Sequence, residues 1–89
     1  MLFPLGRIVA TRGALRMLGA EGISPERLLH RHSQGDWGEL GAEDAQANAD
    51  ALAVRGRLFS AYDIGPSKRI WVITEADRSL TTVLLPDEY

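Results

Sequence analysis

Three strand-like runs fill the last third of the chain and limit what it can fold into. They cover residues 57–62, 69–74 and 80–85. The runs are rich in β-branched and aromatic residues, which suit a pleated, half-buried surface. The two polar connections between them are too short for parallel crossovers. The sequence therefore predicts an antiparallel meander, with its second turn at residues 75–79.

Alternation along these runs predicts which side chains are buried. Successive side chains of a strand point to opposite faces of the sheet, and both faces of the last two runs are partly apolar. One face can take helices. The other must then pack on the connection of a first strand, on a partner subunit or on a binding partner. The side chains predicted to be mostly buried are Ile70, Val72, Ile73, Val83 and Leu84.

The upstream part of the chain predicts one short strand and three helices. The strand covers residues 6–11, where the centre is β-branched, and the helices cover residues 12–21, 25–32 and 42–54. Capping residues and apolar residues at helical spacing support the helices. The predicted fold is α+β, with a short N-terminal strand, three helices and then a three-stranded antiparallel meander packed against the helices. No linker interrupts residues 1–89, so a single domain is expected.

Composition excludes several classes of protein. The absence of cysteine rules out disulfides and thiolate metal sites. The longest apolar run is far shorter than the roughly 18 residues of a membrane span, and the first residues do not resemble a secretory signal. We therefore expect a cytoplasmic protein without membrane contact. A net charge of −2 and a pI of about 5.6 disfavour binding to RNA or DNA through the phosphate backbone, although a local basic site is compatible with them.

A cluster of His30, Arg31 and His32 ends the second predicted helix. Imidazole exchanges protons near neutral pH and Arg holds phosphate, so the cluster could serve a ribonuclease. The simpler interpretation is that these cations offset the helix dipole, in which case His→Gln at either position should cost less than about 1 kcal/mol. Two residues apart, the histidines point to different sides of a helix. The spacing matches no helical zinc motif, so we predict no metal, and no motif indicates a cofactor.

Loop and turn residues are further candidates for binding. Trp37 lies beside Asp36 in a glycine-flanked loop, where it could stack on a base, anchor a partner or pin the loop onto the core. The turn that carries Asp77 and Arg78 is either functional or an ordinary hairpin turn whose Asp and Ser bond the local backbone. The candidate binding residues are Arg31, Asp36, Trp37, Trp71, Asp77 and Arg78.

Four segments carry a family resemblance: Leu5–Thr11, Arg31–Gly38, Trp71–Ser79 and Thr81–Tyr89. Together they resemble a family of small bacterial proteins of unknown function, often carried on plasmids and other mobile elements. Its members are sometimes labelled plasmid-related protein or type I restriction-modification subunit. The resemblance covers essentially the whole chain, but Arg12 stands where relatives carry Pro. A methyltransferase is excluded, because the chain is too short for that cofactor fold and lacks its glycine motif.

A second resemblance rests on the order of helices before an antiparallel meander and on His30 or His32, Arg57, Ser60, Tyr62 and Thr81. In these features the chain is similar to ribonucleases of the barnase, colicin and RelE types. The resemblance lies at the level of the fold and therefore implies little about function.

The leading hypothesis is a non-catalytic binding protein of a mobile element, which blocks a host nuclease or defence complex by masking a surface. Small size without a catalytic motif and apolar residues on both sheet faces motivate it. Its partner would be another protein. The alternatives are a metal-independent ribonuclease or toxin, and a structural homodimer.

Overall fold

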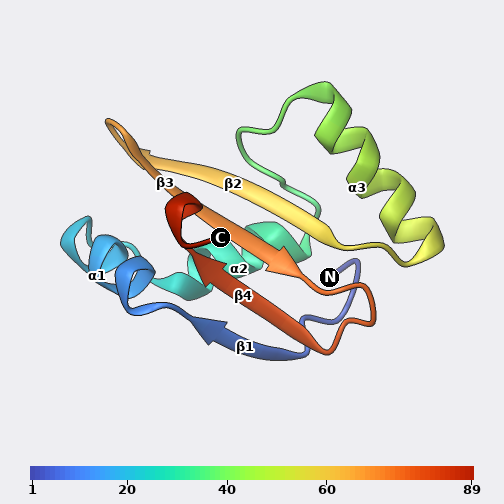
Figure 1. Ribbon diagram of the computed structural model, residues 1–89, viewed down its shortest axis with the longest axis horizontal. Coiled ribbons are helices and arrows are strands. Elements are labelled where there is room, and N and C mark those ends of the chain that lie inside the picture. The colour runs from blue at the N-terminus through green and yellow to red at the C-terminus, as the bar shows by residue number, and fades with distance from the viewer.

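The computed structural model describes residues 1–89 as an α+β fold, as the sequence predicts. A single four-stranded sheet forms the centre of the molecule (Figure 1). The elements in chain order are β1 (Arg7–Ala10), α1 (Arg12–Ala20), α2 (Pro25–Ser33), α3 (Ala42–Val54), β2 (Leu58–Gly65), β3 (Lys68–Thr74), β4 (Leu80–Leu84) and a final 3₁₀ turn, η1 (Pro86–Glu88).

The predicted meander is confirmed, but it is only part of the sheet. The strands β2, β3 and β4 pair in antiparallel fashion, and the second hairpin turns between Thr74 and Leu80. The strand β1 adds itself parallel to β4, giving the order β1-β4-β3-β2. The three-stranded description was therefore incomplete. A parallel neighbour needs a long crossover, and everything between β1 and β4 supplies it here.

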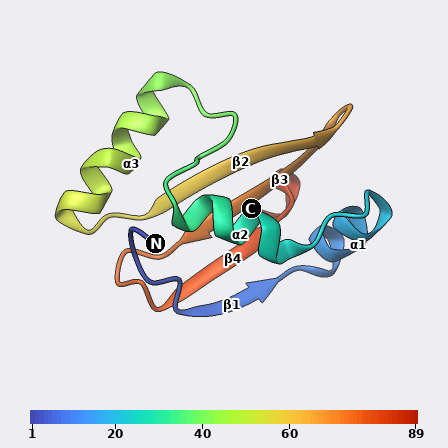
Figure 2. The ribbon, with the colours of Figure 1, turned by 180° about the vertical axis from the view of Figure 1, so that it is seen from behind.

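The two faces of the sheet are covered unequally. Figure 2 shows α2 lying across one face, and Figure 1 shows the C-terminal turn on the other. The helix-covered face holds the main core, in which Leu28 and Leu29 of α2 pack with strand residues. The five side chains predicted to be mostly buried are all buried. We call the other side the open face; by the pairing register, its strand side chains include Phe59, Trp71, Ile73, Thr82 and Leu84.

The helix α3 does not cover a face of the sheet but runs beside β2 (Figure 1). Its buried Asn48 donates from Nδ2 to the Phe59 carbonyl oxygen at 2.7 Å and accepts the Phe59 N–H on Oδ1 at 3.0 Å. One side chain thus replaces a neighbouring strand at this position. Further along, the Ala61 N–H donates to the Trp37 carbonyl at 3.0 Å, and the Glu39 N–H to the Ala61 carbonyl at 2.6 Å. The outer edge of β2 is therefore closed over these residues.

Removal of the Asn48 amide should destabilise the fold strongly. Asn48→Leu keeps a similar volume but leaves the Phe59 N–H and carbonyl without partners, so we expect a loss of about 2–4 kcal/mol. Urea denaturation of both proteins measures it. The control is Gln46→Ala on the exposed side of the same helix, which should stay within about 0.5 kcal/mol of the unmodified protein. Equal stability of all three proteins would contradict the role of Asn48 at the edge.

Candidate functional site

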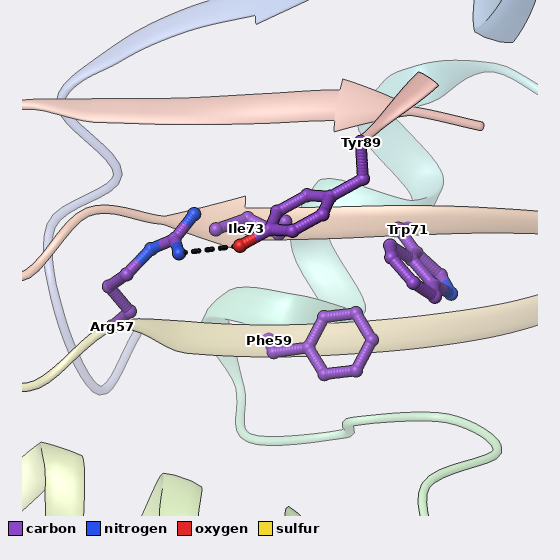
Figure 3. Close-up of a pocket in the computed structure, with 5 residues that line it drawn as sticks. All are labelled: Arg57, Phe59, Trp71, Ile73 and Tyr89. Carbon is purple, nitrogen blue, oxygen red and sulfur yellow. Dashed lines mark hydrogen bonds between the residues drawn. The ribbon is translucent and has the colours of Figure 1, made fainter. Parts of the chain in front are cut away.

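A hollow of about 180 Å³ lies on the open face (Figure 3). Phe59 of β2 and Trp71 and Ile73 of β3 form it together with Arg57, which precedes β2, and Tyr89, which follows η1. Trp71 lies directly opposite Ala61 on the neighbouring strand. Phe59 is two residues before Ala61, so it lies on the same face as Trp71 and diagonally across from it. The site is thus built on two central positions of a regular hairpin.

The aromatic rings of the hollow are ordered by edge-to-face contacts. The Phe59 and Trp71 centroids lie 4.9 Å apart with an angle of 84° between the planes, and Trp71 and Tyr89 lie 5.8 Å apart at 68°. Such geometry is favourable for aromatic quadrupoles. Tyr89 is 69% exposed, so it forms an outer wall and leaves the rings beneath it within reach of solvent. The rings of Phe59 and Trp71 thus form an apolar floor with Tyr89 packed beside it.

Arg57 is the one charged residue that lines the hollow. Its Nη1 donates to the Tyr89 hydroxyl at 2.8 Å, and its Nε lies 3.4 Å from the Glu75 carboxylate. The hydrogen bond to Tyr89, followed by the attraction of Glu75, raises the pKa of Arg57. Its guanidinium therefore stays protonated and neutralised, and it positions Tyr89 rather than offering a free cation.

The size and lining of the hollow limit what it can hold. An apolar cavity of about 150 Å³ accepts benzene, whereas pockets for cofactors and drug-sized ligands reach about 300–1,000 Å³. At about 180 Å³ the hollow fits one ring or one branched aliphatic group. The Trp71 Nε1 is buried without a hydrogen-bond partner, and Figure 3 shows it on the side of the ring away from Arg57. The hollow itself offers no base or metal ligand.

The predicted His–Arg cluster is split by the helix that carries it. His32 is fully buried against the sheet, whereas His30 is exposed. The His32 Nδ1 lies 2.6 Å from the Ser60 hydroxyl, and its Nε2 lies 2.9 Å from the Thr74 hydroxyl. The chain continues from Thr74 to Thr81 at 2.7 Å and ends where Thr81 donates to the Leu5 carbonyl at 2.6 Å. These contacts join α2 to three strands and to the segment before β1.

The carbonyl at the end of this chain fixes the direction of its hydrogen bonds. A carbonyl only accepts, so Thr81 donates to it and accepts from Thr74. Thr74 in turn accepts from the His32 Nε2–H, and Nδ1 accepts from Ser60. His32 is thus a neutral imidazole of one tautomer, and its burial lowers its pKa to about 4. The expectation that His32 merely ends a helix is wrong, because α2 turns this position onto the sheet beside Leu28 and Leu29.

The residues matched to ribonucleases do not share one accessible site. Ser60, Tyr62 and Thr81 are buried under α2 together with His32. Arg57 lies at the hollow of the open face, on the other side of the sheet. The sheet itself therefore separates the only arginine of this set from the buried hydroxyls and imidazole.

The glycine-flanked loop is pinned to the core. The Trp37 ring stacks on Phe3 at 6.2 Å and meets His32 edge-on at 5.6 Å. Asp36 accepts from Arg31 at 2.6 Å, which lowers the pKa of Asp36, and the Asp36 carbonyl accepts from the Tyr62 hydroxyl at 2.6 Å. Burial raises the pKa of Tyr62 to about 12. These three candidate binding residues, Arg31, Asp36 and Trp37, are thus all engaged within the protein.

The turn between β3 and β4 is likewise a structural device. Asp77 accepts from the backbone N–H of Ser79 at 2.9 Å and from its hydroxyl at 2.6 Å, as in the ordinary hairpin interpretation. Arg78 is only 7% exposed and donates to the carbonyls of Ala51 and Gly56 at 3.0 and 2.6 Å. It thereby satisfies carbonyls at the end of α3, a favourable place for a cation.

Sequence reasoning found Trp71 and Arg57 of the hollow but missed three other residues. Phe59 and Ile73 could have been found by aligning the two runs as a hairpin, because that register puts them on the face of Trp71. Tyr89 could not, since its place depends on η1 folding back over the sheet (Figure 1).

Comparison with protein-family models, curated proteins and solved structures found no match. None of the helices is long and apolar enough to cross a membrane, and no group of three or more His, Asp or Glu side chains is placed to hold a metal ion. The fold and the site together define a small α+β protein with an aromatic hollow on the open face of its sheet.

Burial of neutral His32 should make stability depend on pH. The folded pKa of about 4 lies below the unfolded value of about 6.5, so the stabilisation is complete above pH 6.5 and is lost as pH falls towards 4. We expect a loss of about 2 kcal/mol between about pH 7.5 and about pH 5. Denaturation across this range measures it. His32→Gln should abolish this dependence of stability on pH and should lower the stability at neutral pH. The control His30→Gln should change neither. A pH dependence that His32→Gln leaves unchanged would contradict its assignment to His32.

Loss of the Trp37 ring should act on stability. Its contacts with Phe3 and His32 lead us to expect that Trp37→Ala costs about 2–4 kcal/mol. Thermal melting of the two proteins provides the measurement. An unchanged melting temperature together with lost binding to a partner would show that the loop is a contact site rather than a structural one.

Proposed function

We propose that the chain is a non-catalytic protein-binding module whose open face holds one apolar side chain of a partner protein. The observation that carries this proposal is the hollow between the rings of Phe59, Trp71 and Tyr89. Aromatic residues and arginine are enriched in the buried centre of protein–protein interfaces. The side chains that contribute most to binding there fill small, desolvated pockets of the partner. The rings already pack against one another in the free protein, so a partner would find the hollow formed before binding.

The chemistry of the hollow favours a protein partner over a nucleic acid. Aromatic rings on a sheet can stack on bases, but single-stranded binding also needs a positively charged groove. Arg57 is already paired with Glu75 and Tyr89, and the chain as a whole carries a net charge of −2. An uncharged, apolar side chain is thus the better match for this surface.

Masking of a partner surface is the mode of action that such a site supports. The open face is part of a regular sheet, so it can lie against another surface while the hollow anchors one residue. The resemblance to mobile-element proteins suggests a host nuclease or defence complex as the target. A ribonuclease remains an alternative, but the separation of its matched residues by the sheet does not support it.

Peptide selection tests the proposal without knowledge of the partner. A random peptide library displayed on phage is selected on the immobilised protein, and selected peptides are titrated in solution. We expect them to share one aromatic or branched aliphatic anchor. Ile73→Phe, which fills the hollow from its floor, should weaken them at least about tenfold, equivalent to about 1.4 kcal/mol. The matched control is Val54→Ala, which changes an exposed apolar residue on α3.

Two further arms keep this test decisive. Tyr89→Ala removes an exposed wall of the hollow with little effect on folding and should also weaken the peptides. A labelled single-stranded RNA is incubated with the protein in the absence of metal, and we expect neither binding nor cleavage. Peptides that ignore both substitutions would overturn the proposal. So would salt-sensitive RNA binding or RNA cleavage.

A further inference from the structure

The strand β1 leaves one edge of the sheet open. On its inner side the Arg7 N–H donates to Ser79 at 2.9 Å and the Thr11 N–H donates to Val83 at 3.0 Å. Backbone groups alternate along a strand, so the N–H and carbonyl groups of Ile8 and Ala10 point to the outer side. No turn, loop or side chain forms a hydrogen bond there, whereas the outer edge of β2 is closed by α3 and its preceding loop.

Apolar side chains accompany this free backbone. Ile8 is 49% exposed and Val9 is 36% exposed, on opposite faces of the strand. Natural proteins usually protect such edges with very short strands, proline, bulges, charges or a covering element. The strand β1 is short, but it has no proline or bulge, and its one charge, Arg7, lies at its start. The edge is thus suited to accept another strand.

We propose that β1 pairs with β1 of a second copy, antiparallel, about a two-fold axis at Val9. In an antiparallel pair, hydrogen bonds join opposite residues whose N–H and carbonyl groups point toward the other strand. In β1 these are Ile8 and Ala10, and one register uses both of them in each copy, with Ile8 opposite Ala10 and Ala10 opposite Ile8. Val9 then faces Val9, and Arg7 faces Thr11. The strand is therefore complementary to itself.

Charges on the open face match this register. The Glu88 Oε1 accepts from the Thr11 hydroxyl at 2.6 Å and from the Leu85 N–H at 2.7 Å, while Oε2 has no hydrogen bond. The Arg7 side chain has no hydrogen bond or ion pair within the protein. Because Arg7 of one copy stands across from Thr11 of the other, its guanidinium can reach that free carboxylate oxygen. The two-fold axis creates this ion pair twice.

A second copy fits this edge better than an arbitrary strand does. The self-pairing places no two like charges directly opposite, and it supplies an unpaired cation for an unused carboxylate oxygen. The resulting sheet would continue through both molecules, with the two open faces on the same side, because directly opposite residues share a face. The contact is small for a permanent interface, so we expect a dimer that dissociates on dilution.

Cysteine scanning tests the register directly, since the chain has no cysteine of its own. Facing residues of a non-hydrogen-bonded antiparallel pair lie about 4.5 Å apart at Cα, within the range of a disulfide. Val9→Cys should therefore form a disulfide-linked dimer under mild oxidation. In this register Ile8 lies opposite Ala10 of the second copy, not opposite the second Ile8. Ile8→Cys should therefore cross-link at least about tenfold less. Equal cross-linking of the two variants, or none of Val9→Cys, would overturn the register.

Sedimentation equilibrium tests the association in the unmodified chain. We expect the mass to rise from one chain to two with concentration, and Arg7→Glu to raise the dissociation constant at least about tenfold. Arg27→Glu is the charge-matched control, because Arg27 is an exposed residue of α2, and it should have no effect on the dissociation constant. Ile73→Phe should also leave the dimer intact, which separates it from the peptide-binding hollow. A single-chain mass throughout, or a dimer that ignores Arg7→Glu, would overturn the proposal.

Discussion

The buried hydrogen-bonded chain centred on His32 is the interaction on which the arrangement of the layers depends. It ties α2 to β2 through Ser60, to β3 through Thr74 and to β4 through Thr81, and it ends on the segment before β1. Every polar atom of the imidazole is satisfied, and in a water-free interior an unsatisfied one would be costly. An apolar core would tolerate small shifts of α2. This chain of bonds holds the helix in one position over the sheet.

The meander was predictable because its information is local. Alternation, β-branched residues and short polar turns specify the three strands and their buried residues without reference to the rest of the molecule. The position of β1 in the sheet was not predictable, because a four-residue strand carries no signal that identifies the strand with which it pairs. The role of α3 was equally hidden. Its small apolar face suggested packing on the sheet, whereas Asn48 attaches it to the edge through two backbone hydrogen bonds.

Some residues of the candidate site could be recognised from their neighbours in the sequence, whereas others depend on contacts between distant parts of the chain. Loop and turn residues rich in charge attracted attention, yet Asp36 and Arg78 serve the fold. A polar side chain in a turn has the same appearance in the sequence whether it binds a partner or a helix end. The hollow instead combines one hairpin, which can be aligned from the sequence, with Tyr89, which only tertiary structure brings near. His32 was misread because its nearness to the C-terminus of α2 was given more weight than its place on the same side of the helix as Leu28 and Leu29.

The parallel pairing of β1 with β4 also determines when the protein can fold. It joins segments at opposite ends of the fold, as in the hydrogen bonds from Thr81 to Leu5 and from Thr11 to Glu88, which span 76 and 77 residues. On the ribosome the helices emerge before any strand of the meander, so Leu18, Leu28 and Leu29 have no sheet to cover. Such non-local contacts slow folding. Until β4 is available, these apolar side chains stay exposed, which is the condition in which folding chains are prone to aggregate.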